Sequence, residues 1–244
     1  MNAKKRIKKI LTKGARKVKY RKGFGIHSPF VFSLITQVID EKLPYYDYRK
    51  LKDIRERLTP PRSIKNGRLL KNSVPLKLVY LYYRLVNRFL PNEILELNND
   101  GGIITMALAM PFSKAHVTTL GVDDIKLERV HGIVEQEKQI NVTILDDDQN
   151  KWLSSLPDNY KADMVVIHKS DNEENYSVIL SKISSIVNPN GIIVVAGINS
   201  NAYIRKFWTQ LTLHEEVKIS LDLYELGIAI YHEMLYKQHF IVSF

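Results

Sequence analysis

Hydrophobic positions follow two periods along the chain beyond residue 90. Short apolar runs bounded by Pro, Gly, Asn or Asp predict buried strands, and longer stretches with an apolar residue every three to four positions predict helices. Strands are expected at the following ranges: 94–97, 116–121, 141–145, 162–168, 192–196, 217–224 and 227–231, with 240–244 as their extension or a short edge strand.

Helices are expected between these strands, at 103–110, 125–138, 173–187 and 201–211. Strands that alternate with helices form a parallel sheet with helices on both of its faces. The last two expected strands are antiparallel, unlike those of nicotinamide-binding folds. The pattern predicts a Rossmann-like, seven-stranded α/β sandwich.

The first ninety residues read as a helical extension. Four helices are predicted, at 3–20, 30–38, 45–59 and 76–89, of which the third is polar and the others have periodic apolar positions. Ser28 and Pro29 are suited to be the N-cap and first residue of the second helix. Residues 59–67 are rich in turn formers and predict a loop. We expect three parts: a basic segment (1–22), a helical cap (23–90) and a Rossmann-like domain (91–244).

The net charge of +10 comes from the N-terminus. Residues 1–22 hold eleven Lys or Arg and no Asp or Glu, so the other 222 residues carry a net charge of −1. A basic amphipathic helix of this kind can lie on an anionic membrane or on RNA phosphates. The alternative is that it covers the domain or is a solvated tail.

Several classes of protein are excluded by composition. The chain has no cysteine, so it has no disulfide, thiolate metal site or cysteine nucleophile. It has no apolar run of about eighteen residues that would predict a membrane-spanning helix. The basic N-terminus lacks the apolar core of a signal peptide. A cytoplasmic location is therefore expected.

The stretch from Pro91 to Ala109 reads as strand, turn and helix. The turn, Asn98-Asn-Asp-Gly-Gly102, consists of residues that tolerate unusual backbone angles. Such a unit places backbone N–H groups and a helix N-terminus in one crevice. Nucleotide-like cofactors bind in crevices of this kind.

Four motifs give the chain a resemblance to a known family. They are Gly23-Phe-Gly-Ile-His-Ser-Pro-Phe30, Leu95-Glu-Leu97, Asp222-Leu-Tyr-Glu-Leu-Gly-Ile228 and Lys237-Gln-His-Phe240. With the order of elements, they resemble class I S-adenosylmethionine (SAM)-dependent methyltransferases, and more closely a family of methyltransferase-like proteins typical of Bacteroidetes. The resemblance covers nearly all of the chain beyond residue 20, and it implies the class I methyltransferase form of the sandwich.

The resemblance implies a SAM site. Its first turn usually reads Glu-Ile-Gly-Thr-x-x-Gly, which this chain matches at Glu96 and Gly102, with Asn98 in place of the first glycine and Gly101 beside the last. The family carries an acid for the ribose hydroxyls at the end of the second strand. In this chain the acid comes two or three residues later, at Asp123. Asp147, within the acidic run 146–148, lies where the family contacts the adenine amino group; a solvated helix cap is the alternative.

The metal ligands of the related Mg²⁺-dependent O-methyltransferases have no counterpart here. Those enzymes carry acids after the fourth and fifth strands, where this chain reads Ile167-His-Lys-Ser-Asp171 and Val195-Ala-Gly-Ile-Asn199. His168 and Asn199 are poor substitutes, because Mg²⁺ prefers carboxylate oxygens. We predict no metal.

His168 is the expected general base, since it ends a central strand and an imidazole can accept the proton of a hydroxyl or amine. Lys169 or His27 is expected to assist it; the alternative is that His168 caps the strand without chemistry. The predicted function is methyl transfer from SAM to a small hydroxyl or amine acceptor. The rival hypothesis is a catalytically silent binding or scaffold protein of the same fold. We keep a homodimer among the expected partners.

Overall fold

The computed structural model describes residues 10–12, 14–16, 26–58, 64–65, 68–69, 74–99, 101–121 and 123–244. They divide into two compact units, which are described separately. The continuous unit is Lys42–Trp152. The discontinuous unit joins the described residues up to Glu41 with Leu153–Phe244.

The continuous unit contains a parallel sheet in the order β3-β4-β5, formed by Glu93–Leu97, His116–Leu120 and Val142–Leu145. The helices of this unit are α3 (Tyr48–Leu58), α4 (Leu76–Phe89), α5 (Ile103–Ala109) and α6 (Asp124–Gln136). A further helix, α7 (Gln149–Ser155), begins here. All of α5 is buried, and it packs against α3, α4 and α6.

The end of α4 fixes where β3 begins. Leu90 takes a left-handed conformation with φ 47°, and its N–H bonds to the Val86 carbonyl. Pro91 follows and cannot continue the helix. The chain then turns directly into β3, as the sequence predicts.

The discontinuous unit contains five strands in the order β6-β7-β9-β8-β10. The bounds of these strands are β6 Ala162–Ile167, β7 Val187–Ala196, β8 Val217–Asp222, β9 Leu226–Tyr231 and β10 Gln238–Ile241. β6 and β7 are parallel, β9 is antiparallel to both of its neighbours, and β10 is parallel to β8.

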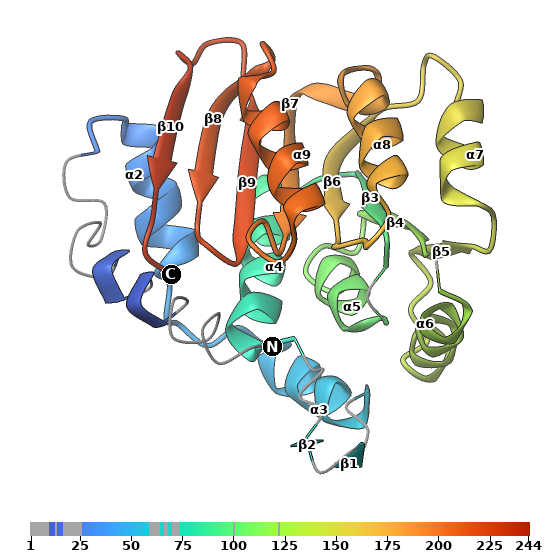
Figure 1. Ribbon diagram of the computed structural model, residues 1–244. Helices are drawn as coiled ribbons and strands as arrows, with labels where there is room; N and C mark the ends of the chain where they lie inside the picture. The colour runs from blue at the N-terminus through green and yellow to red at the C-terminus, as the bar shows by residue number, and fades with distance from the viewer. Residues whose placement is uncertain are drawn as a thin grey trace. The chain divides into compact units, whose positions relative to one another are not determined.

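The helices of the discontinuous unit are α2 (Pro29–Leu34), the π-helix η1 (Ile35–Ile39), α8 (Glu173–Ile186) and α9 (Ala202–Leu213). α9 packs on β8, β9 and α8 (Figure 1). Ser28 caps α2 through its Oγ, 3.4 Å from the Val31 nitrogen, as predicted. The expected helix over 30–38 is confirmed, but its second half is π-helical.

All seven expected strands are present, as β3 to β9, and the α/β fold class is confirmed. The eighth, β10, is the edge strand that the sequence left open. Two details differ. The loop expected over 59–67 includes one strand of a short hairpin, β1 (Ile64–Lys65) with β2 (Arg68–Leu69). β7 already begins at Val187, with a register shift that accommodates the expected turn.

The predicted helix over 3–20 lies mostly outside the described residues. Its described parts, 10–12 and 14–16, are helical. Across the described parts of the chain, every helix is too short or too polar to cross a membrane.

Candidate functional site

The turn after β3 depends on residues with positive φ. Asn98, Gly101 and Gly102 have φ values of 55°, 94° and 99°. A Cβ on Gly102 would lie 3.0 Å from Ile133 Cγ2, so glycine lets the start of α5 approach α6. A Cβ on Gly101 would meet nothing within 4 Å, so the turn has an open side there.

A buried carboxylate holds this turn in place. Glu96, in β3, is 0% exposed. Its Oε2 accepts hydrogen bonds from Thr105 Oγ1 at 2.7 Å, Thr119 Oγ1 at 2.8 Å and Asn99 Nδ2 at 2.9 Å. The partners belong to α5, β4 and the turn. Glu96, which the resemblance implies as a cofactor contact, thus uses this oxygen to join three elements inside the core.

Asn99 completes the cluster. Its N–H donates to the carbonyl of Leu120, the last residue of β4, at 2.9 Å. Its Oδ1 accepts from the Gly101 N–H at 2.7 Å, which closes an Asx-turn. The backbone between β3 and α5 is therefore fixed by buried hydrogen bonds as well as by glycine.

Asn98 pairs with a residue that the sequence analysis missed. The Asn98 N–H donates to Gln149 Oε1 at 2.7 Å, and Gln149 Nε2 donates to Asn98 Oδ1 at 3.2 Å. Each residue is 2% exposed. Gln149 is the first residue of α7, after β5. Because β4 lies between β3 and β5, this pair spans the carboxyl end of β4.

Asp123 is the N-cap of α6. Its Oδ1 accepts from the Lys126 N–H at 3.0 Å, and its side chain is exposed. At Gly121, just after β4, a Cβ would lie 2.9 Å from the side chain of Leu127 in α6, so a side chain there would force Leu127 to move. Asp123 is therefore held beside the end of β4, where the resemblance implies an acid for the ribose.

The acidic run after β5 divides its tasks. Asp148 Oδ1 accepts from the Lys151 N–H at 2.8 Å and caps the start of α7. Asp146 Oδ1 lies 3.1 Å from His131 Nε2. Asp147 is exposed between them. The helix-cap alternative holds for Asp148, and Asp147 stays the predicted adenine contact.

In the discontinuous unit, His168 directly follows β6 and is 3% exposed. Lys169 is exposed, and its Cβ would lie 3.8 Å from a Cβ on Gly197, which follows β7. The Ser170 N–H donates to the Tyr176 hydroxyl at 2.6 Å. Burial raises the pKa of Tyr176 from the ordinary 10.0 to about 12, and its hydroxyl also donates to the Ser170 carbonyl at 3.2 Å.

His27 does not join His168. It is exposed at the start of α2, where the Phe30 ring packs edge-on against His232 with centroids 5.8 Å apart. His232 follows β9, which runs antiparallel to β7, so it lies at the edge where β6 and β7 begin. His168 lies at the opposite edge, where β6 ends. Sequence spacing alone could not reveal this separation.

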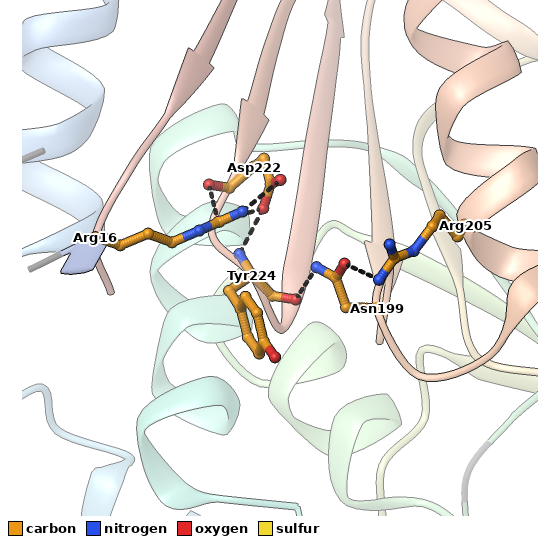
Figure 2. A network of polar contacts seen from close by, with 5 residues as sticks. All are labelled: Arg16, Asn199, Arg205, Asp222 and Tyr224. Carbon is orange, nitrogen blue, oxygen red and sulfur yellow. Dashed lines mark hydrogen bonds and ion pairs between the residues drawn. The ribbon is translucent and has the colours of Figure 1, made fainter. Parts of the chain in front are cut away.

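Asn199 stands where the resemblance would place a metal-binding acid after the fifth strand. Both the nitrogen and the oxygen of its side-chain amide are hydrogen-bonded (Figure 2). Its Nδ2 donates to the Tyr224 carbonyl at 2.8 Å, and its Oδ1 accepts from Arg205 NH2 at 2.8 Å. A carboxylate could not make the first of these bonds. Among the described residues, no group of three His, Asp or Glu is placed to hold a metal ion.

The same network includes Arg16, from the described part of the basic N-terminal segment (Figure 2). Arg16 NH1 and NH2 donate to the two carboxylate oxygens of Asp222 at 2.7 and 3.0 Å. The guanidinium carbon lies 5.2 Å from the centre of the Tyr224 ring. Asp222 Oδ1 also accepts from the Tyr224 N–H at 2.7 Å. Arg16 thus contacts both the end of β8 and the β8–β9 turn.

Comparison with known proteins finds similarity in structure only. No family model matches the sequence, and no curated protein matches it. A methyltransferase from Podospora anserina, solved with SAH bound, is similar with a TM-score of 0.61 and 10% identity, over 84% of this chain and 97% of that one.

Two further solved structures are similar at the same level. The O-methyltransferase TomG of Streptomyces achromogenes, in complex with SAM, gives a TM-score of 0.57 and 14% identity, over 78% of this chain and 91% of that one. An O-methyltransferase of Bacillus cereus, in complex with SAH, gives a TM-score of 0.54 and 16% identity, over 80% of this chain and 96% of that one. At such identities the similarity concerns the fold, and this chain has the Rossmann-like fold of these methyltransferases.

Proposed function

We propose that the chain is a SAM-dependent methyltransferase that acts on a small hydroxyl or amine acceptor without a metal ion. The observation that carries the proposal is the turn after β3. Buried bonds from Glu96 and Asn99 fix it, Gly101 leaves it open on one side, and it lies at the carboxyl ends of parallel strands. Cofactors bind at such edges of α/β sheets.

The described residues of the continuous unit fit the nucleoside cofactor in their chemistry. The turn from Asn98 to Gly102 would hold the methionine part, Asp123 would accept from the ribose hydroxyls and Asp147 from the adenine amino group. When bound, SAM supplies a methyl group activated by the sulfonium. The chain contributes mainly orientation, which is the larger part of catalysis in such a displacement.

His168 is the proposed general base, with Lys169 beside it in sequence. An imidazole can take the proton of a hydroxyl or amine at neutral pH. His27 is left out of this proposal, because it lies at the opposite edge of its sheet from His168.

Metal independence is supported by the bonding of Asn199. Its oxygen faces the cationic Arg205, which is an unfavourable neighbour for a divalent cation. Turnover measured with and without EDTA tests this part of the proposal. Equal rates are expected, and loss of turnover that Mg²⁺ restores would contradict it.

Calorimetric titration with S-adenosylhomocysteine tests the cofactor. The matched variants are Gly101→Val, which places a branched side chain at φ 94° on the open side of the turn, and Gly132→Ala, an open position in α6. We expect binding by the wild type and Gly132→Ala, and a loss of at least tenfold in Gly101→Val. Absence of binding by the wild type and every variant at millimolar ligand would favour the catalytically silent alternative.

The basic segment 1–22 stays a predicted contact for anionic membranes or RNA, and a homodimer stays a proposal. Co-sedimentation with anionic vesicles or with RNA, using the chain with and without residues 1–22, tests the first. Equal sedimentation of both forms would contradict it.

Light scattering, which measures the molar mass in solution, tests the proposed homodimer.

A further inference from the structure

We infer that Asn98 and Gln149 form a bar across the cofactor crevice, and that a nucleoside ligand must open this bar to bind. The inference rests on the proposed function and adds a step to it. The pair would keep the crevice closed and ordered in the free protein. It would thereby lower the affinity of the protein for its cofactor.

The sheet order places the bar. Neighbouring strands lie about 4.8 Å apart, so the ends of β3 and β5 are separated by about 10 Å, with the end of β4 between them. Asn98 follows β3 and Gln149 follows β5. Their two hydrogen bonds therefore cross the space above the end of β4, between the turn and the acidic run that are proposed to hold the cofactor.

The bonding of the pair shows why it would compete with a ligand. Gln149 Oε1 accepts from the Asn98 N–H, a donor on the backbone of the turn. Gln149 Nε2 is directed to Asn98 Oδ1 rather than into the crevice. Both residues are almost wholly buried, and their hydrogen bonds link the ends of β3 and β5, so a ligand placed over the end of β4 would have to displace them.

Asn98 is not required by the backbone at this point. Its φ of 55° is a left-handed conformation that glycine adopts without strain. Asparagine tolerates the same angle and adds the acceptor that holds Gln149. Glycine at position 98 is therefore compatible with the backbone angle of the turn and removes the side chain that takes part in the bar.

The apparent affinity for a ligand falls in proportion to the fraction of molecules whose site is open. If the bar is closed in most molecules, removing it raises the affinity. We expect an increase of about tenfold or more in the affinity for S-adenosylhomocysteine when either partner is truncated.

The experiment compares S-adenosylhomocysteine binding by calorimetry in the wild type, Asn98→Gly and Gln149→Ala. Lys138→Gly is the matched control, because Lys138 is an exposed residue with φ 51° between the end of α6 and the start of β5, at the amino ends of the strands rather than at the carboxyl ends where the crevice is proposed. It introduces a glycine at the same kind of backbone angle. Thermal unfolding of each unliganded variant shows whether it is folded.

Tighter binding by both Asn98→Gly and Gln149→Ala, with Lys138→Gly equal to the wild type, supports the bar. Binding by the wild type that is as tight as, or tighter than, binding by the variants overturns the bar and leaves the proposed function intact. Binding by none of the four proteins at millimolar ligand overturns both. Binding by the two truncated variants alone would be the strongest support, since the bar would then close the wild-type site.

Discussion

Arg16 and Asp222 are 206 positions apart in the sequence and form a bidentate ion pair, with both side chains about 16% exposed. A paired, largely buried guanidinium makes stronger hydrogen bonds than a surface lysine does. We expect Arg16→Ala to lower the free energy of unfolding by about 1–3 kcal/mol, measured by urea denaturation.

Arg16→Lys separates charge from geometry in that experiment. It keeps the positive charge and loses the second hydrogen bond, so an intermediate loss is expected. Equal stability of the wild type and Arg16→Ala would show that the pair contributes nothing to folding.

The carboxylate of Glu96 is expected to be a major contributor to the stability of the continuous unit. Glu96→Ala leaves donors of Thr105, Thr119 and Asn99 without this acceptor, and we expect a loss of about 3 kcal/mol or more. Thr119→Val, which removes one donor with little change in shape, should cost about 1–2 kcal/mol. Chemical denaturation measures both, and a smaller loss in Glu96→Ala than in Thr119→Val would contradict this account.

Asp123 has two roles that one pair of variants can separate. Asparagine caps helices about as well as aspartate, but it carries no charge. Asp123→Asn should therefore leave the melting temperature unchanged and weaken S-adenosylhomocysteine binding. Asp123→Ala should weaken binding and also cost about 1 kcal/mol of stability through the lost cap of α6. Unchanged binding in Asp123→Asn would remove the ribose from the proposed roles of this residue.

The ion pairs of Glu137 make the stability of the folded protein depend on pH. Burial raises the pKa of its carboxyl, but hydrogen bonds from Arg57 and Lys50 outweigh burial and hold the pKa below the ordinary 4.5. A lowered pKa in the folded state stabilises the protein above the unfolded pKa, and that contribution is lost as the pH falls through the folded pKa.

Glu137→Gln tests this directly. We expect it to lower the free energy of unfolding by about 1 kcal/mol at pH 7, with the difference from the wild type disappearing at a pH below the folded pKa. Urea denaturation at several pH values measures it. A difference that is the same at every pH would assign the effect to packing instead.

His168→Gln tests the proposed base. A general base typically contributes about 10² to 10⁴ in rate, so we expect kcat to fall by at least about a hundredfold. S-adenosylhomocysteine affinity should stay unchanged, which distinguishes lost chemistry from a damaged fold. His27→Gln is the control, and we expect it to keep wild-type turnover, because His27 lies at the other edge of its sheet.

The alternation of strands and helices could be predicted because period and burial are written in the sequence. Short apolar runs predict β3 to β9. The place of Ser28 before Pro29 predicts that Ser28 is the N-cap of α2. For β10 the sequence predicts either an extension or an edge strand, because its partly exposed residues carry little pattern. The π-helical second half of the 30–38 helix could not be predicted, since its apolar spacing is that of an α-helix.

The candidate site was predicted less well than the fold. Gly101 and Gly102 stand out in the sequence through turn chemistry, whereas Asp123 is indicated only by the family resemblance and its role as the N-cap of α6 was not predicted. Gln149 does not, because its role comes from reaching across β4 to Asn98. The inward direction of Glu96 and the separation of His27 from His168 likewise depend on how strands are paired, which local sequence does not encode.

The division of the chain has a consequence for the order of folding. The continuous unit is a single stretch, so its strands can pair as soon as Trp152 has been synthesised. The described residues before Lys42 belong to the other unit, so they must wait for partners that come after Trp152. Arg16 meets Asp222 only when almost the whole chain is present. Contacts between such distant residues form slowly, and domains fold as units during synthesis. We therefore expect the half that holds the proposed cofactor turn to form first on the ribosome, and the half that holds His168 to complete the protein.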